Sequence, residues 1–502
     1  MEIDFEKINK VYFIGIGGIM MSAAAKYFLA GKKQVFGSDR SKGALIFELR
    51  KMGAKIAVGH QAGNIKKDFD LVIYTQAIAA DNPELKKARQ LQIKTLTIYQ
   101  LLGVLAKEKK TITVSGMHGK STTTAMIGLI MEVAGFDPTV FVGTKVKEWQ
   151  SNFRLGELKY LLSEACEYKD NFLNFRPDIA VLTNLEAEHL DYFKNLAGVK
   201  KSFWKFISQI KKGGYLLANA DDRNLQELLK KFSGRKLTFG LKDKADFSAE
   251  EIRHKQGGVV EFRLKVLKKA YKSFHEQKFG LKVPGEFNIY NALGAVTAGA
   301  VLGVKPKTVR KVLAEFDGVW RRFELKGKAE GVEIYDDYGH HPTEIKATLN
   351  AAGEKFKGRK WWVVFQPHLY SRTRDFLAEF AEALNLAPNL MVAEIYPARE
   401  KNVYHISSRD VVNLINKKYR RESPALFFKT FSEIIGYLKK NLKPGDCPAC
   451  PACPAYPAYR QAGGRQGRQA ARQGSPQGRK TLKHGRCPPA SQVRALPGRL
   501  KH

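Results

Sequence analysis

A glycine-rich turn between a predicted strand and a predicted helix carries the residues best suited to chemistry. Stretch 111–124 begins with β-branched residues typical of a strand, turns at Gly116 and Gly119, and enters a helix near Lys120. Such a turn aims backbone N–H groups at one spot, and the helix adds its positive N-terminal end, which together favour a phosphate. Lys120 can reach the β- and γ-phosphate oxygens, and the Ser121 hydroxyl can ligate Mg²⁺. The alternative is a plain connecting turn, but the order strand, turn, Lys-Ser and helix favours a nucleotide loop.

Acidic side chains and a histidine follow the next two predicted strands. The first strand, 161–165, ends near Glu164, and the second, 179–184, leads into a polar cluster. The carboxyl ends of parallel strands meet at the edge where the phosphate loop lies, so we expect these side chains to surround a Mg²⁺–triphosphate. An acidic solvated turn is the alternative. The cluster consists of Glu186, Glu188, His189 and Asp191.

Two further turns near the C-terminal end carry histidines. Stretch 333–344 is predicted to be a strand, a polar turn and a helix with Pro342 in its first turn. Stretch 361–372 repeats this design, with a strand followed by His368 and Arg372. A histidine can also be a core or capping residue, but two such clusters at strand ends indicate a site for an anion or an amino acid.

Near the N-terminus, Val11–Met20 is predicted to be a buried strand that breaks into the turn Gly15-Ile-Gly-Gly18. A second strand ends at Ser38-Asp39, where a dinucleotide-binding unit places its ribose-binding acid. Met20 replaces the third glycine of that fingerprint, so the turn is weak evidence for NAD. A nicotinamide-dependent oxidoreductase remains an alternative, but it gives the Lys120 loop no role.

Composition excludes several classes. The chain has 502 residues, 44% of them apolar, and a net charge of +36. Eleven Lys and Arg without any Asp or Glu lie in 447–502. Elsewhere lysines are spread through helical stretches alongside glutamates, which indicates a solvated surface or anionic substrates rather than nucleic acid. We find no signal peptide and no membrane-spanning run, and only one of five cysteines precedes the tail, so we expect a cytoplasmic protein without disulfides.

The alternation of strands and helices predicts an α/β protein of three domains. We expect an N-terminal Rossmann-like domain at 1–107, a P-loop ATPase-like domain with antiparallel hairpins at 108–318, and a C-terminal Rossmann-like domain at 319–446. Asn288 and Asn291 share one face of a helix in the second domain. Asn288 could instead be an N-cap.

These motifs together resemble the Mur ligase family, over residues 8–446. The resemblance implies ATP-dependent peptide-bond formation through an acyl phosphate, with UDP-N-acetylmuramate and L-alanine as substrates for the alanine-adding branch. A ligase that recycles a tripeptide onto the same sugar and an inactive nucleotide-binding remnant remain alternatives. The motifs are Gly15–Gly18, Gly116–Thr124, Glu164–Tyr168, Thr183–His189, Asn288–Asn291, Arg321–Glu324, Asp336–Glu344 and Phe365–His368.

The resemblance also implies roles for individual residues. Lys120, His189, His340 and Arg372 are expected to be catalytic, and Ser121, Glu164 and His189 to hold Mg²⁺. The ATP-binding set is expected to be Gly116, His118, Gly119, Lys120, Ser121, Thr122, Asn288, Asn291, Arg322 and Asp337. Gly17, Gly18, Ser38, Asp39, His60 and Thr75 are expected to bind the UDP-sugar, and Tyr338 and His368, with His340 and Arg372, the L-alanine or acyl intermediate.

The sequence departs from the family at three places. Met20 replaces a glycine in the first turn, and Leu369 stands where many members have Arg. After Asp446 the family continues with a hydrophobic strand and a glycine-rich turn, whereas this chain has a Cys-Pro-Ala repeat and a basic run. We therefore predict that the third domain lacks its last strand and that 447–502 is disordered, after a change of reading frame. A metal site formed by the tail cysteines is the alternative, and the nucleotide sequence around codon 446 tests the frame change.

Overall fold

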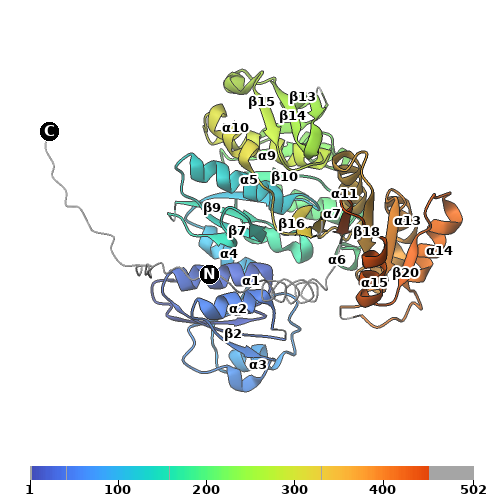
Figure 1. Cartoon of the computed structure of the whole chain (residues 1–502). Coiled ribbons are helices and arrows are strands. Elements are labelled where there is room, and N and C mark those ends of the chain that lie inside the picture. The colour runs from blue at the N-terminus through green and yellow to red at the C-terminus, as the bar shows by residue number, and fades with distance from the viewer. Residues whose placement is uncertain are drawn as a thin grey trace, which may run out of the picture. The chain divides into compact units, whose positions relative to one another are not determined.

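The computed structural model describes residues 3–40, 42–157, 159–242, 244–329, 331–398 and 400–451. The chain forms three sheets in succession, which run from blue to red in Figure 1. This arrangement confirms the prediction of a three-domain α/β protein. Disorder was predicted for 447–502, and it is wrong for Cys447–Pro451, which form a strand. The rest of the tail, 452–502, lies outside the described residues, and so do Cys453 and Cys487 of the alternative metal site.

The first sheet is entirely parallel and has the strand order β3-β2-β1-β4-β5. Its strands are short apolar runs such as Val-Tyr-Phe-Ile, because both faces of a parallel sheet are covered. The strands are β1 (Lys10–Ile14), β2 (Gln34–Asp39), β3 (Lys55–Val58), β4 (Leu71–Tyr74) and β5 (Thr95–Thr97). The helices are α1 (Ile19–Ala30), α2 (Ala44–Lys51), α3 (Pro83–Gln90) and α4 (Ile98–Ala106).

The second sheet has ten strands, in the order β15-β14-β13-β12-β11-β10-β6-β9-β7-β8. The strands are β6 (Lys110–Ser115), β7 (Thr139–Val146), β8 (Ser151–Arg154), β9 (Tyr160–Glu164), β10 (Ile179–Leu182), β11 (Tyr215–Asn219), β12 (Arg235–Gly240), β13 (Phe247–His254), β14 (Val260–Val266) and β15 (Lys278–Leu281). β6 lies between β9 and β10, parallel to both. β13, β14 and β15 form the predicted antiparallel hairpins.

Helices of the second sheet bring the phosphate loop against a later part of the chain. They are α5 (Lys120–Val133), α6 (Leu190–Phe193), α7 (Leu196–Ile207), α8 (Arg223–Lys231), α9 (Glu286–Val301) and α10 (Pro306–Glu315). The Ala-rich α9 packs along α5 (Figure 1). Most residues of both helices are buried. Small side chains allow this close approach.

The third sheet has the order β16-β17-β21-β18-β19-β20. Its strands are β16 (Glu324–Ala329), β17 (Val332–Asp337), β18 (Trp361–Phe365), β19 (Asn389–Ala393), β20 (Leu426–Phe428) and β21 (Cys447–Pro451). Its helices are α11 (Pro342–Lys355), α12 (Tyr370–Asp375), α13 (Leu377–Leu384), α14 (Ser408–Lys418) and α15 (Phe431–Asn441).

The prediction that the third domain lacks its last strand was wrong. β21 lies between β17 and β18 and is parallel to both. The turn before it places the chain in this gap: the Asp446 carboxylate accepts a hydrogen bond from Trp362 Nε1 at 3.1 Å, and Cys447 N donates to Lys360 O at 3.1 Å. Two of the five residues of β21 are prolines, which have no backbone N–H to donate to a neighbouring strand. The other three residues keep their backbone N–H groups. Five residues therefore suffice for a strand that composition alone argued against.

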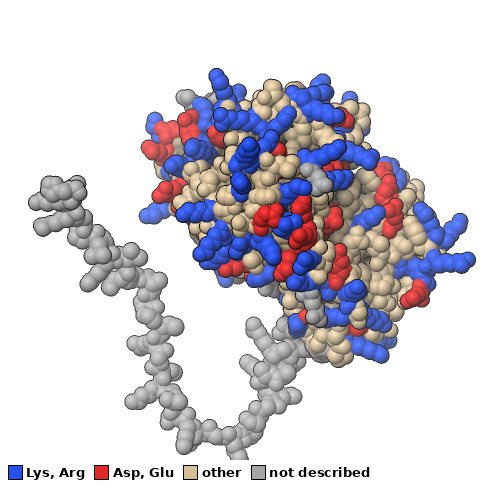
Figure 2. All heavy atoms as spheres, turned by 90° about the horizontal axis from the view of Figure 1, so that it is seen from above, with Lys and Arg blue, Asp and Glu red and all other residues tan. Residues whose placement is uncertain are grey.

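The surface agrees with the charge pattern of the sequence. Figure 2 shows Lys and Arg scattered over the visible face with Asp and Glu among them, rather than one continuous basic stripe. Within the described ranges, none of the helices has the length and apolarity needed to cross a bilayer.

Candidate active site

The loop between β6 and α5 has the geometry of a phosphate cradle. Gly116 has φ +134° and Gly119 has φ +83°, a region that only glycine enters freely. A Cβ at Gly116 would meet the Thr183 hydroxyl, and one at Gly119 would meet the Asn291 side chain. The segment just after β10, which is paired with β6, fixes the loop, because His118 N donates to Asn184 Oδ1 at 2.8 Å.

Lys120 is folded back over this loop. Its ammonium group donates to the carbonyls of Gly116 and Met117, and Glu167 Oε2 lies 3.2 Å from it. Burial lowers the pKa of Lys120, but Glu167 and neighbouring anionic groups outweigh that effect and raise it, so the lysine is charged. A cation therefore stands at the N-terminal end of α5, where phosphate would bind.

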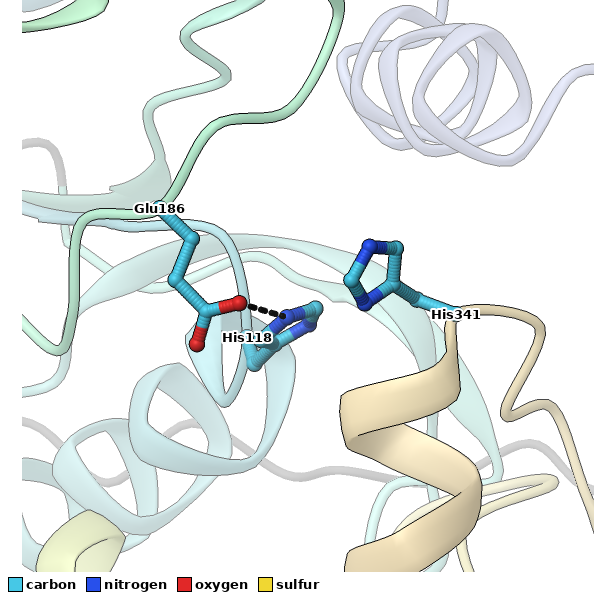
Figure 3. A group of neighbouring side chains, drawn as sticks. All are labelled: His118, Glu186 and His341. Atoms are coloured by element: carbon cyan, nitrogen blue, oxygen red, sulfur yellow. Dashed lines mark ion pairs between the residues drawn. The ribbon is translucent and has the colours of Figure 1, made fainter. Parts of the chain in front are cut away.

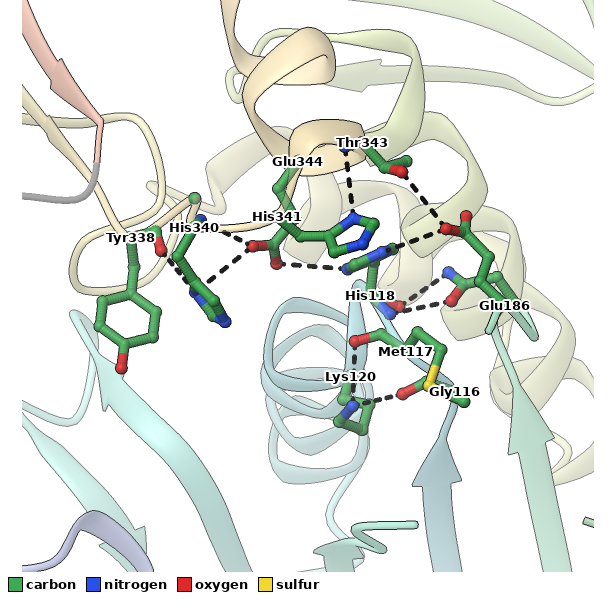
Figure 4. A network of polar contacts seen from close by, with 12 residues as sticks. Gly116, Met117, His118, Lys120, Glu186, Tyr338, His340, His341, Thr343 and Glu344 are labelled. Carbon is green, nitrogen blue, oxygen red and sulfur yellow. Dashed lines mark hydrogen bonds and ion pairs between the residues drawn. The ribbon is translucent and has the colours of Figure 1, made fainter. Parts of the chain in front are cut away.

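His118 connects the loop to the third sheet (Figure 4). Its Nδ1 lies 3.3 Å from Glu344 Oε1, and its Nε2 lies 3.7 Å from Glu186 Oε2. Burial lowers the pKa of His118, but the two carboxylates dominate and raise it to about 10. The protonated His118 therefore pairs with one carboxylate from the domain of the second sheet and one from the domain of the third sheet.

A cavity of about 490 Å³ opens over the loop and α5. It brings together residues of the second and third sheets, as expected for a ligand bound between domains. Six of the residues predicted for the nucleotide, the metal or the amino acid do not line it: Gly116, Glu164, Asn288, Tyr338, His368 and Arg372. The predicted residues that do are His118, Gly119, Lys120, Ser121, Thr122, His189, Asn291, Arg322, Asp337 and His340.

The side chains predicted to hold Mg²⁺ lie beside the loop. Glu164 is buried at the end of β9 and accepts hydrogen bonds from Gly143 N and the Ser121 hydroxyl. Burial raises its pKa despite these bonds. A second group consists of Glu167, Glu188 and His189, whose ligand atoms all lie within 4.8 Å of one another. Oxygen ligands and one imidazole suit a divalent cation near a triphosphate.

Another group with metal-ligand chemistry consists of His118, Glu186 and His341. Figure 3 shows Glu186 and His341 on either side of the His118 ring. The carboxylates of Glu186 and Glu344 already balance the charge of His118. His341 Nε2 is buried and has no hydrogen-bond partner among the described residues.

The two asparagines of α9 lie one behind the other. Asn291 contacts the first turns of α5 through Thr123, whose Oγ1 donates to Asn291 Oδ1 at 3.2 Å. Asn288 stands behind it, donates to Pro284 O at 2.7 Å and accepts from Asn291 Nδ2 at 3.1 Å. The N-cap of the helix is Gly285, so the interpretation of Asn288 as an N-cap was wrong.

Arg322 and Asp337 enter the cavity from the third sheet. Arg322 Nη1 lies 3.0 Å from Glu344 Oε1. Asp337 ends β17 and accepts hydrogen bonds from the backbone N–H groups of Gly339 and Phe323, both at 2.7 Å. Burial raises the pKa of Asp337, although Arg322 and these bonds oppose the shift.

The histidine-bearing turns of the third sheet meet beside the cavity. His340 lies 3.5 Å from Glu344 Oε2, and its ring centroid is 6.4 Å from that of His368. Arg372 Nη1 lies 3.4 Å from His368 Nδ1. Tyr338 is 49% exposed and packs against guanidinium groups instead. The structure thus brings His340, His368 and Arg372 together, with only His340 in the cavity wall.

The residues predicted to bind the UDP-sugar lie at the carboxyl edge of the first sheet. Gly17 N donates to Asp39 Oδ2 at 2.9 Å, and a Cβ at Gly17 would collide with that carboxylate. Ser38 and His60 contact each other at 2.9 Å. Thr75 lines a second cavity, of about 520 Å³, which residues of the second sheet's domain also line.

Sequence reasoning missed two carboxylates of the site. Glu167 pairs with both Lys120 and His189, and Glu344 pairs with His118, Arg322 and His340. Glu167 lies inside the motif Glu164–Tyr168 and Glu344 inside Asp336–Glu344, but neither motif predicts a role for them. Their position in the sequence could have indicated a role, because Glu167 follows the end of β9 and Glu344 follows the end of β17, and both strand ends were predicted to lie at the site.

Three α/β domains around a phosphate loop with adjacent carboxylates define a nucleotide-dependent enzyme. Family models match along the described chain: "Mur ligase family, catalytic domain" at residues 10–110, "Mur ligase middle domain" at 114–299 and "Mur ligase, glutamate ligase domain" at 321–449. The chain belongs to the Mur ligase family, a family of ATP-dependent ligases, as the resemblance predicted.

Individual relatives show which members of the family the chain is similar to. The chain is 42% identical over 447 residues to a UDP-N-acetylmuramate–L-alanine ligase of Caldanaerobacter subterraneus subsp. tengcongensis, covering 89% of this chain and 95% of the relative. It is 44% identical to the ligase of the same name from Acetivibrio thermocellus, covering 88% and 93%. The crystal structure of UDP-N-acetylmuramate-alanine ligase from Thermotoga maritima is similar with a TM-score of 0.77 and 28% identity, covering 92% of this chain and 99% of that chain.

Proposed function

We propose that this protein joins L-alanine to the carboxylate of UDP-N-acetylmuramate at the expense of ATP, a step of peptidoglycan precursor synthesis. The observation that carries the proposal is the shared cavity. Lys120 and the phosphate loop form one wall, and Arg322, Asp337 and His340 of the third sheet form another. Relatives with the name of this activity, at 42% and 44% identity, support the choice of substrates. Because the reaction consumes ATP, we place it in the cytoplasm.

The chemistry requires activation of a carboxylate. A carboxylate is a poor acylating agent, so its oxygen attacks the γ-phosphorus of ATP, the bond to the β-phosphate oxygen breaks, and ADP leaves. The amine of L-alanine then attacks the acyl carbon of the acyl phosphate, releases phosphate and loses a proton. Lys120 and the N-terminal end of α5 neutralise the charge that builds on the transferred phosphoryl group.

The residues beside the loop fit Mg²⁺. Ser121 and Glu164 supply oxygen ligands at one position, and Glu167, Glu188 and His189 supply ligand atoms within 4.8 Å of one another at a second. Bound there, Mg²⁺ supplies charge neutralisation at the phosphate oxygens. Glu167 also orients Lys120 and His189, since it pairs with both.

The third sheet supplies the amine side. Asn291 and Asp337 face the nucleotide side of the cavity, where Arg322 adds a positive charge. His340, held by Glu344, faces the acyl phosphate and takes part in proton transfer from the amine. His368 and Arg372, next to it, hold the carboxylate of the amino acid.

Phosphate release from ATP tests the proposal. Release is expected only when UDP-N-acetylmuramate and L-alanine are both present, because the amine must consume the acyl phosphate for turnover. A competition assay with L-alanine and a tripeptide amine separates the two ligase activities, and L-alanine is expected to be the substrate used. Release that depends on neither substrate, or ATP binding without any turnover, contradicts the proposal.

A further inference from the structure

A carboxylate lies fully buried in the first sheet, away from the cavity over the phosphate loop. Glu84, in the first turn of α3, has 0% exposure. A buried ionised carboxylate is costly unless hydrogen bonds satisfy its oxygens. No role follows for Glu84 from the sequence motifs, yet its neighbours include Ser38 and His60, both predicted to contact the UDP-sugar.

Every group around Glu84 can donate a hydrogen bond. Oε1 accepts from Tyr12 Oη at 2.8 Å and from Asn64 Nδ2 at 2.6 Å, with Gln61 N at 3.4 Å. Oε2 accepts from the Ser38 hydroxyl and lies 3.1 Å from His60 Nδ1. An ionised carboxylate only accepts, so this surrounding matches the charged form of Glu84.

These contacts determine which ring nitrogen of His60 carries the proton. Ser38 has one hydroxyl proton, which it donates to Glu84, so towards His60 Nδ1 at 2.9 Å its oxygen can only accept. Glu84 can also only accept. Both partners of Nδ1 therefore require a proton on Nδ1, and in the neutral ring Nε2 keeps its lone pair.

We propose that Glu84 is a positioning residue that fixes His60 as the Nδ1–H tautomer, so that Nε2 accepts a hydrogen bond from the ring N3–H of the uracil base. This inference rests on the proposed sugar-nucleotide substrate. Uracil carries a hydrogen on N3, whereas cytosine has a lone pair there. A fixed acceptor therefore binds uracil and repels cytosine, because two lone pairs would face each other.

The tautomer can be measured without any substrate. In the full-length protein with ¹⁵N-labelled histidine, the His60 signals are assigned by their loss in His60→Ala. We expect Nδ1 to show the shift of a protonated nitrogen and Nε2 that of an unprotonated one. A proton on Nε2 instead overturns the proposal, whatever the variants do.

Binding of UDP and CDP, measured by calorimetry, tests the consequence. The wild type is expected to bind UDP at least about tenfold more tightly than CDP. In Glu84→Gln the amide can donate to Nδ1, the tautomer is no longer fixed, and the UDP:CDP affinity ratio should fall about tenfold. His60→Ala should lose the ratio as well. ATP affinity should stay unchanged in both variants.

Tyr12→Phe is the matched control. It removes one donor to Glu84 without touching His60, so it should lower the thermal unfolding midpoint but keep the UDP:CDP ratio. A folded Glu84→Gln with an unchanged ratio overturns the proposal. If the wild type binds neither UDP nor UDP-N-acetylmuramate, the proposed substrate is wrong, and the ¹⁵N spectrum still decides the role of Glu84.

Discussion

At the scale of single residues, Lys120 belongs to the proposed ATP site and not to the proposed UDP-sugar site. It contacts the phosphate loop and Glu167, whereas the predicted UDP-sugar residues lie on the first sheet. Lys120→Ala should reduce ATP-dependent phosphate release by at least about 10²-fold, since it removes a cation from the transferred phosphoryl group. Direct binding of UDP-N-acetylmuramate should be unchanged. Lys211→Ala, which breaks a pair with Asp178 outside the cavity, is the control and should retain activity. Equal loss of release and sugar binding in Lys120→Ala would show that the domains do not divide the work in this way.

His118 makes a pH-dependent contribution to stability. The carboxylates of Glu186 and Glu344 outweigh burial and raise its pKa from 6.5 to about 10. The folded pKa is above the unfolded one, so the contribution is complete below 6.5 and is lost as pH rises through about 10. The difference in thermal unfolding midpoint between wild type and His118→Gln should therefore be largest near pH ~6 and shrink towards pH ~10. His405→Gln, at an exposed histidine, should show no such trend. A difference that grows with pH would contradict the raised pKa.

At the scale of elements, β21 is the strand that the sequence wrongly predicted to be missing. Its contribution to the stability of the third domain can be measured. It fills the centre of the third sheet between β17 and β18. A chain that ends at residue 446 leaves both neighbours with an open edge and should lose cooperative unfolding of the third domain, seen by thermal denaturation. A chain that ends at residue 451 retains the strand and should unfold like the full-length protein. Equal unfolding of the two truncated chains would mean that β21 contributes nothing.

The strand-turn-helix signals were sufficient to predict the sheets, the antiparallel hairpins and the phosphate loop. They succeed because glycine turns, buried apolar strands and Lys-Ser at a helix start are local features. The missing strand was misjudged because β21 forms through its neighbours: Trp362 and Lys360 bind the turn before it, and composition does not show that. Glu344 and Glu84 were missed for a related reason. Each acts through partners 20 or more residues away, such as Arg322 and Ser38, which only the folded chain brings together.

At the scale of the whole molecule, three successive residues of β7 touch three parts of the chain. Gly143 N donates to Glu164, and Thr144 Oγ1 donates to Trp320 O, in the segment leading to the third sheet, at 2.9 Å. Lys145 Nζ pairs with Glu48 of α2, in the first sheet. β7 therefore contacts the predicted magnesium ligand, the segment that leads to the third sheet, and the first sheet. A shift of β7 would change all three contacts.

Glu48 is the point where this strand meets the first sheet. It pairs at 2.6 Å with Lys26, which is only 3% exposed and also donates to Asn152 Oδ1 at 2.8 Å. Glu48→Gln leaves Lys26 buried without a counter-charge and should destabilise the protein by about 2–3 kcal/mol, less than for a fully buried pair because Glu48 is 28% exposed. Urea unfolding measures this loss, and limited proteolysis should show faster cleavage between the first and second sheets.

Adding Lys26→Met to Glu48→Gln should restore most of the lost stability, since removing both members of a buried pair is nearly neutral. Asp68→Asn, in the exposed pair with Lys10, is the control and should leave the free energy of unfolding almost unchanged, because solvent screens an exposed pair. If the double variant is as unstable as Glu48→Gln alone, then Glu48 acts through packing rather than charge. The junction would in that case not depend on the Lys26 ammonium group, and β7 would be held to the first sheet by its apolar contacts with α1.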